Sequence, residues 1–458
     1  MKIKQQILIT LIAITAIISA QTQFSGHISE NTTWGSDMLI TGDVWVDDLA
    51  TLSIQNGVTV YFVRVDSDQN GIGDTDFIVN GQLVANGVTF TSYETSPQNT
   101  DWGGIDYLTA ADGQNSTLYN TQIFYAYQGL YMDGHFMTLN NLEIAGSNQY
   151  GLHIQNSYST TSLTNVNLVD NETYGMEIVN GDVSINGGLI FGNSSYGLKA
   201  HSGANLDING LTSSSNGEWG IKLDNLQEAS LNNVQCVSNA FEGLWISGGD
   251  SISISSSGFA SNSGSGISIT DGASDISFDY CNVYNNSQGF DVRSNSTATV
   301  LYSNIYDNNG SSGIGIGGDS QMTINYCNIY NNSVSNEEVS ISISNPGNTL
   351  TIHESGCSSS WKTSSSGTLD LSNYGTINKI DFRARIDVDE CSSADDRSMS
   401  LHNQNGAQLW NYSTACNNCD YNEYIYTVDS QSATKFYISQ GHDYHDSIHL
   451  WIDELVIY

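Results

Sequence analysis

A short pattern of hydrophobic and polar positions recurs along most of the chain. A glycine is followed by an apolar, a variable and an apolar residue, as in YGLHI at 150, YGLKA at 196 and WGIKL at 219. The glycines of this repeat are Gly104, Gly129, Gly151, Gly175, Gly197, Gly220, Gly243, Gly266, Gly289 and Gly313. They are separated by 25, 22, 24, 22, 23, 23, 23, 23 and 24 residues. Alternation is typical of half-buried strands, so the regular period indicates one β unit repeated many times.

The length of the repeat restricts the architecture. A step of about 23 residues is too short for a four-stranded propeller blade, and no helical period is present. Two or three short strands per repeat, stacked coil on coil, predict a parallel β-helix of about 11 or 12 coils.

An asparagine precedes many of the glycines by four residues. These asparagines are Asn171, Asn193, Asn216, Asn239, Asn262, Asn285 and Asn309. We expect each amide to hydrogen-bond to its copy in the next coil, about 4.8 Å away. We also expect the repeat glycines to supply an unusual φ at the bend.

The repeat predicts which side chains face outward. The residue after each glycine is apolar in every copy and must point inward, so the second and fourth residues after the glycine point outward. Charged, histidine and aromatic members of these two rows gather in a few coils: Tyr131, His153, Glu177, Lys199, His201, Lys222, Asp224 and Trp245. We call these residues the polar strip and expect them to form a contiguous patch that points to solvent.

The strip offers candidate catalytic groups. Glu177, Lys199, Lys222 and Asp224 are the catalytic candidates, and Tyr131, His153, His201 and Trp245 are the ligand-binding candidates. A lyase acting on uronates would use a lysine as its base. A hydrolase needs two carboxyl groups about 5–9.5 Å apart, which Glu177 and Asp224 would have to supply. The alternative is a solvated sheet face whose charges pair for solubility.

A row of aromatic residues lies beside the strip. Tyr150, Tyr174, Tyr196 and Trp219 each come immediately before a repeat glycine. Four aromatic rings in consecutive coils form either a platform for sugar rings or a stacked ladder that fills the bend, and the ladder is the simpler interpretation.

Residues 66–76, with the sequence DSDQNGIGDTD, interrupt two strand-like segments. Their spacing resembles the calcium loops of EF-hand, dockerin and thrombospondin type 3 repeats, although Phe77 occupies the usual acidic position twelve. The expected ligands of a structural Ca²⁺ are Asp66, Asp68, Asn70, the carbonyl of Ile72, Asp74 and Asp76. An acidic turn without metal is the alternative.

The ends of the chain differ from the repeat. Two early lysines and an apolar run over 7–19 predict a signal peptide at 1–20, cleaved after Ala20. The repeat region spans 21–347, with an N-terminal cap and the loop insertion within 21–100. Residues 348–458 contain longer strand-like runs and are predicted to form a β-sandwich.

The cysteines suit an exported protein. Cys357, Cys391, Cys416 and Cys419 can form two disulfides in three pairings, and a zinc site is the weaker alternative in a secreted chain. Cys281 and Cys327 occupy equivalent places two coils apart, which is too far for a bond, so we expect buried thiols.

The repeat resembles the right-handed parallel β-helix superfamily, which includes pectate lyases, over residues 35 to 350. The opening segments LATLSIQNGVTVYF and DFIVNGQLVANGVTFTS, followed by WGGI, are similar to secreted bacterial β-helix proteins. The closing WIDELVIY resembles the last strand of jelly-roll modules. This resemblance implies a right-handed helix and a fold group of mixed functions.

Composition limits the partners. The net charge of −36 and the pI of about 4.1 disfavour nucleic acid and anionic membrane surfaces, and no membrane insertion is expected after signal cleavage. We therefore expect a secreted or cell-surface protein that binds polysaccharide along the polar strip. The alternatives are a polysaccharide lyase or glycoside hydrolase using the same strip, and a structural or adhesive surface protein.

Overall fold

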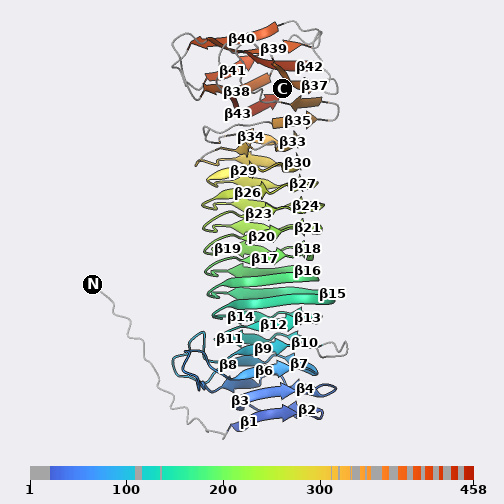
Figure 1. The fold of residues 1–458 in the computed structure, drawn as a ribbon, viewed down its shortest axis with the longest axis vertical. Helices are drawn as coiled ribbons and strands as arrows, with labels where there is room; N and C mark the ends of the chain where they lie inside the picture. The colour runs from blue at the N-terminus through green and yellow to red at the C-terminus, as the bar shows by residue number, and fades with distance from the viewer. Residues whose placement is uncertain are drawn as a thin grey trace, which may run out of the picture.

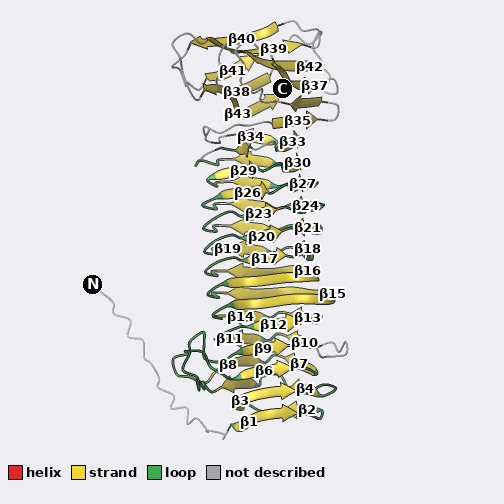
Figure 2. Cartoon of the chain, in the orientation of Figure 1, coloured by secondary structure: helices red, strands yellow, loops and turns green. Residues whose placement is uncertain are grey.

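The computed structural model describes residues 21–108, 116–134, 137–310, 312–317, 320–330 and 332, and beyond these the backbone of strands between 341 and 457. The described residues are arranged as strands joined by short turns, without a helix (Figure 2). The predicted signal peptide and Cys357, Cys391, Cys416 and Cys419 lie outside the described residues.

The chain winds as a parallel β-helix of about 12 coils, which confirms the predicted fold class (Figure 1). A representative coil contains three strands, β17 (Leu198–His201), β18 (Asn205–Asn209) and β19 (Thr212–Ser214). Each pairs in parallel with the equivalent strand of the next coil, so three sheets run along the axis.

The first sheet contains β17 and the strands at equivalent positions in the other coils. Its other strands are β6 (Asp76–Val79), β9 (Gly104–Tyr107), β12 (Leu130–Asp133), β20 (Ile221–Asp224), β23 (Leu244–Ser247), β26 (Ser265–Thr270), β29 (Gln288–Val292) and β32 (Ile314–Ile316). The second sheet contains β18 together with β2 (Thr32–Trp34), β4 (Thr51–Ile54), β7 (Gln82–Asn86), β10 (Thr117–Tyr119), β13 (Thr138–Asn140), β21 (Glu228–Asn232), β24 (Ile252–Ser255), β27 (Ile276–Asp279), β30 (Thr297–Leu301), β33 (Gln321–Asn325) and β35 (Ile341–Asn345).

The third sheet, which contains β19, completes each coil. Its other strands are β5 (Thr59–Phe62), β8 (Thr89–Ser92), β11 (Gln122–Phe124), β14 (Glu143–Ala145), β22 (Gln235–Val237), β25 (Gly258–Ala260), β28 (Asn282–Tyr284), β31 (Asn304–Tyr306) and β34 (Asn328–Tyr330). Four longer strands pass through more than one sheet: β1 (Thr22–Ile28), β3 (Met38–Val46), β15 (Tyr150–Val169) and β16 (Tyr174–Phe191).

The parallel order ends at β35, which pairs antiparallel with β36 (Asn348–Thr351). The remaining strands are β37 (Ser364–Asp370), β38 (Ile380–Val388), β39 (Asp396–Asn403), β40 (Gln408–Ala415), β41 (Asn422–Tyr426), β42 (Lys435–Gly441) and β43 (Ile448–Ile457). They pair antiparallel in two sheets, in the orders β37-β42-β39-β40 and β41-β38-β43. That these sheets form a jelly-roll-like sandwich stays a prediction.

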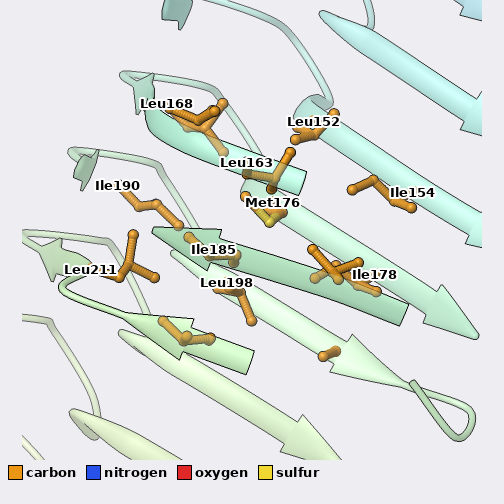
Figure 3. Close-up of a cluster of buried hydrophobic side chains, with 14 of the residues drawn as sticks. Leu152, Ile154, Leu163, Leu168, Met176, Ile178, Ile185, Ile190, Leu198 and Leu211 are labelled. Atoms are coloured by element: carbon orange, nitrogen blue, oxygen red, sulfur yellow. The ribbon is translucent and has the colours of Figure 1, made fainter. Parts of the chain in front are cut away.

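The core follows from the alternation. The residue after each repeat glycine is buried, and layers of Leu, Ile, Val and Met from neighbouring coils stack along the axis. Figure 3 shows Leu152, Met176 and Leu198 in consecutive coils, with Ile154 and Ile178 beside them. One continuous core therefore fixes which face of each strand is outward.

Buried asparagines form the predicted ladder through much of the helix. Asn193 donates from Nδ2 to Asn216 Oδ1 at 2.9 Å, and the same oxygen accepts the Asn193 backbone N–H at 3.2 Å. The ladder continues through Asn239 and Asn262. The next members are Asn286 and Asn308, so the expected Asn285 and Asn309 are wrong by one residue.

The repeat glycines act differently from the prediction. Among them only Gly104 has a positive φ. A Cβ on Gly197 would lie 2.7 Å from Asn216 Nδ2 and 2.4 Å from the Gly220 carbonyl oxygen. Glycine is thus required here because the next coil's backbone and ladder amide approach too closely for any side chain.

Cys281 and Cys327 lie two coils apart with one coil between them, and neither is in a disulfide. Ser303 lies between them, donating its backbone N–H to Cys327 Sγ and accepting the Cys281 backbone N–H on its Oγ. Burial raises the pKa of both thiols to about 11. Among the described residues no helix is long and apolar enough to span a membrane.

Candidate functional site

The polar strip occupies the outward face of the first sheet, from β12 to β23. Figure 1 shows these strands following one another along the axis. The strand register pairs Glu177 with Lys199 and Lys199 with Lys222 in successive coils. Tyr131, His153 and Trp245 continue the same row, and His201 and Asp224 pair in the second outward row. Residues more than twenty positions apart are therefore direct neighbours.

Glu177 lies at the centre of the strip and contacts three basic side chains. Its Oε1 accepts a hydrogen bond from Lys199 Nζ at 3.1 Å and lies 3.2 Å from His201 Nε2. Its Oε2 lies 3.2 Å from His153 Nδ1. Three of the eight strip residues thus converge on one carboxylate.

The expectation that the whole strip points to solvent is wrong for two residues. Glu177 is 6% exposed and His153 is 8% exposed. Both leave the sheet on its outward face, but the Tyr131 and Tyr150 rings pack on His153, and the Lys199 and His201 side chains reach over Glu177. Glu177 and His153 are therefore covered by neighbouring side chains, whereas the other six strip residues are more accessible to solvent.

The contacts around Glu177 shift the pKa values of Glu177 and Lys199 in opposite directions. Burial alone would raise the pKa of Glu177, but the His153 and Lys199 contacts outweigh it and lower the pKa to about 2. Burial would lower the pKa of Lys199, but the hydrogen bond and charge of Glu177 outweigh it and raise the pKa. Near neutral pH the pair is a carboxylate and an ammonium, so Glu177 is poorly suited as a proton donor and Lys199 as a base.

Lys222 connects the strip to the aromatic row. Its Nζ lies 4.4 Å from the ring centroid of Trp245, 5.2 Å from that of Trp219 and 5.5 Å from that of Tyr196. It also lies 3.5 Å from Asp224 Oδ2. The Lys222 ammonium therefore makes cation–π contacts with three rings and an ion pair with Asp224.

The four rings of the aromatic row contact one another in consecutive coils, but only Tyr196 and Trp219 are stacked, so both interpretations of the row stay open. The Tyr174 and Tyr196 ring centroids are 4.8 Å apart, and the Tyr196 and Trp219 rings stack at 5.0 Å with an interplanar angle of 12°. All four rings are half-buried. The row consequently forms a partly exposed aromatic edge along the same coils as the lysines.

The sequence interpretation missed one contact residue. Gln155 donates from Nε2 to the Tyr131 hydroxyl and contacts His153 Nε2 through its Oε1 at 3.4 Å. Its place in the second outward row was the available signal, but an uncharged amide did not stand out. Gln155 orients the phenol and the imidazole at this end of the strip.

Trp245 is the last residue of the strip, and the next basic residue along the sheet belongs to a separate ion pair. Trp245 donates from Nε1 to Thr270 Oγ1 at 3.4 Å. Arg293 donates to Asp291 within its own sheet at 2.6 Å and lies three coils beyond Lys222. Arg293 is therefore not part of the cluster.

The loop at 66–76 brings together some of the predicted ligands. Carboxylate oxygens of Asp66, Asp68 and Asp74 lie within 4.8 Å of one another. Asn70 donates to Asp68, and its own oxygen accepts the Ile72 backbone N–H. The donor set of three carboxylates and an amide suits a hard cation.

Asp76 lies outside that group. It belongs to β6 on the first sheet, where its backbone N–H donates to Asp43. Burial, with Asp106, Asp43 and Asp74 nearby, raises its pKa to about 6. Asp76 is therefore close enough to Asp106, Asp43 and Asp74 to be affected by their charges, but it is not in the group of three carboxylates that could hold the ion.

Comparisons with known proteins concern the helix. A family described as "Right handed beta helix region" matches residues 202–357, and the coils are right-handed. No curated protein sequence matches the chain.

Several solved structures are similar. The periplasmic alginate epimerase AlgG is 13% identical, with 67% of this chain and 75% of that chain covered and a TM-score of 0.41. Tailspike protein 2 from the Escherichia coli bacteriophage CAB120 is 13% identical, with 92% and 64% covered and a TM-score of 0.43. The A-module of the Azotobacter vinelandii mannuronan C-5 epimerase AlgE4 is 14% identical, with 68% and 90% covered and a TM-score of 0.33.

Proposed function

We propose that this is a secreted or cell-surface protein that binds a polysaccharide along the polar strip and the aromatic row. The supporting observation is the alignment of two parallel features over the same coils. Lys199 and Lys222 project beside the edge formed by Tyr174, Tyr196 and Trp219. Aromatic faces pack on the apolar faces of sugar rings, and the ammonium groups bind hydroxyl or carboxylate oxygens.

The protonation states of Glu177 and Lys199 favour binding over catalysis by these two groups. Glu177 and Lys199 neutralise each other, and Lys222 is enclosed by rings and Asp224. The preorganised Glu177–Lys199 ion pair presents a fixed charged donor and a fixed charged acceptor. Such an arrangement is suited to holding a ligand in one orientation.

A polysaccharide-cleaving or modifying enzyme is the second candidate. The observation that favours it is His153, which is buried between Tyr131, Tyr150 and Glu177. A histidine oriented by a carboxylate is a suitable general base or acid. In this proposal Glu177 orients His153 and takes no proton itself.

A glycan array followed by product assays distinguishes these functions. Wild-type protein is compared with Lys222→Ala and Glu177→Gln, using reducing-end release and absorbance at 235 nm as readouts. Retention of a glycan without products, weakened about tenfold in Lys222→Ala, supports the binder. Product release that Glu177→Gln abolishes supports the enzyme, and silence in both assays leaves a structural or adhesive protein.

A further inference from the structure

Tyrosine side chains form a second, separate surface near the C-terminal end of the helix. The motif Tyr–x–Asn–x–Tyr begins at residues 280, 302 and 326, in the last three coils of the third sheet. Tyr280, Tyr302 and Tyr326 are 58%, 42% and 38% exposed. This surface lies on β28, β31 and β34 and on the corner before them, not on the first sheet.

The rings stack along the axis. Tyr280 and Tyr302 have centroids 5.0 Å apart with an interplanar angle of 11°, and Tyr302 and Tyr326 are 4.7 Å apart at 5°. A second column, Tyr284 with Tyr306, stacks at 4.9 Å and 2°. The outward tyrosines are therefore parallel plates in two columns.

An amide ladder separates the columns. Asn304 donates from Nδ2 to Asn282 Oδ1 at 2.8 Å, and Asn328 donates to Asn304 Oδ1 at 2.8 Å. Asn282 and Asn328 are exposed and Asn304 is half-buried. Each amide retains one N–H and lone-pair capacity beyond the ladder, so the strip between the rings offers both donors and acceptors.

The backbone conformation at the three tyrosines of the first column disfavours a bulky side chain. Tyr280, Tyr302 and Tyr326 have φ values of 53°, 48° and 54°, in the left-handed region that disfavours bulky residues. In earlier coils this corner is occupied by residues suited to that conformation: Asn120, Asn141, Asn165, Gly187, Gly210, Asn233 and Ser256. Fold stability therefore favours asparagine or glycine here, and three consecutive tyrosines need another reason.

The charges around this surface restrict its ligand. Across 276–330 the one basic residue is Arg293, which is on the first sheet and donates to Asp291. Asp279 and Asp307 directly flank the columns in sequence. An anionic chain would be repelled here, whereas an uncharged chain of sugar rings would meet aromatic plates and amide groups.

We propose that the two tyrosine columns and the Asn282–Asn304–Asn328 ladder bind a neutral polysaccharide chain. The rings pack on the apolar faces of successive sugars, and the amides hydrogen-bond to the hydroxyls. This site is independent of the polar strip, because the two occupy different sheets.

The test replaces Tyr280, Tyr302 and Tyr326 together by asparagine in the full chain. Asparagine suits the corner and restores the residue type of earlier coils, so the melting temperature should be unchanged or higher. Binding to cellulose, chitin, mannan and xylan is measured by pull-down and affinity electrophoresis. Wild type should bind at least one of them, and the triple variant should bind it about tenfold more weakly or less.

One control accompanies the triple variant. Tyr125→Asn removes an exposed tyrosine with φ of 63° at another corner, outside both tyrosine columns, and should retain neutral-polysaccharide binding. Absence of wild-type binding to all four polysaccharides would overturn the proposal. Unchanged binding by the triple variant would overturn it too, as would wild-type dimerisation that the triple variant abolishes in sedimentation, which would assign the surface to a second copy.

Discussion

Glu177 shows how one residue acquires its properties from three coils. In the sequence it is an ordinary acidic residue in an outward position. In the helix it contacts His153 from the preceding coil and Lys199 from the following one, and its exposure falls to 6%. Paired charges that are covered in this way hold their protonation states more firmly than exposed ones.

Replacing Glu177 by glutamine should reduce stability in a pH-dependent manner. The folded pKa of about 2 lies below the ordinary 4.5, so this carboxylate stabilises the fold fully above pH 4.5 and loses that effect as the pH falls through 2. We expect Glu177→Gln to lower stability at pH 7 by about 1 kcal/mol, since solvent screens the edge of the cluster. The difference from wild type should shrink between pH 4.5 and 2.

Calorimetric melting across this pH range checks the expectation. Asp224→Asn is the matched control, because its carboxylate contacts one lysine at 3.5 Å and its side chain is 23% exposed. The control should change stability less. Parallel pH profiles for wild type and Glu177→Gln would contradict the role assigned to the cluster.

At the scale of elements, the asparagine ladder links each coil to the next. Asn216 accepts from both the backbone and the side chain of Asn193 and donates to Asn239. Asn216→Ala leaves buried donors without partners, which we expect to cost about 2 kcal/mol or more.

Thermal melting of Asn216→Ala and a control measures this effect. Asn285→Ser is the control, because serine occupies the equivalent left-handed corner at Ser215, Ser238 and Ser261. The ladder variant should melt several degrees lower and the control close to wild type. Equal melting temperatures would show that the ladder does not stabilise the coils.

The loop at 66–76 remains a proposed calcium site. Bound Ca²⁺ would neutralise Asp66, Asp68 and Asp74. At a hundredfold excess over Kd it should stabilise the folded state by about 2.7 kcal/mol. The melting temperature should therefore be higher with Ca²⁺ than with EDTA. Asp68→Asn should reduce the shift, and Asp207→Asn on the second sheet should not. An identical melting temperature with Ca²⁺ and EDTA in wild type would exclude the site.

Much of this architecture could be predicted because the repeat carries the register. Once Gly197 and Gly220 are aligned, the side chain of Lys199 must lie beside that of Lys222. The ladder prediction failed at Asn285 because a corner can gain or lose one residue without disturbing the glycine spacing. The spacing of the strands therefore does not predict a one-residue shift at a bend.

The covered state of Glu177 and the meaning of the tyrosine columns could not be predicted from the sequence. Burial on the outward face depends on which long side chains lean sideways from neighbouring coils, as Lys199 and His201 do. The unusual character of Tyr302 depends on its φ of 48°. Both are properties of conformation, and the repeat pattern does not encode them.

At the scale of the whole molecule, the coils of the β-helix stack into a long rod (Figure 1), and the chain is strongly acidic. Its few cations in the helix are concentrated: between residues 65 and 350 they are Lys199, Lys222 and Arg293. The strip is a locally neutral area on a strongly negative surface, so a ligand approaching elsewhere meets repulsion if it is anionic. The parallel sheets give that area a direction, along the axis.

Binding of oligosaccharides of increasing length is the most direct test of this account. The ligand is the polysaccharide selected on the array, titrated calorimetrically into wild type, Tyr150→Ala and Trp219→Ala. The two aromatic residues are three coils apart, about 14 Å at the strand spacing. Affinity should rise until the oligosaccharide spans this distance, and each variant should remove part of the rise; affinity independent of length, or unchanged in both variants, would contradict a ligand lying along the strip.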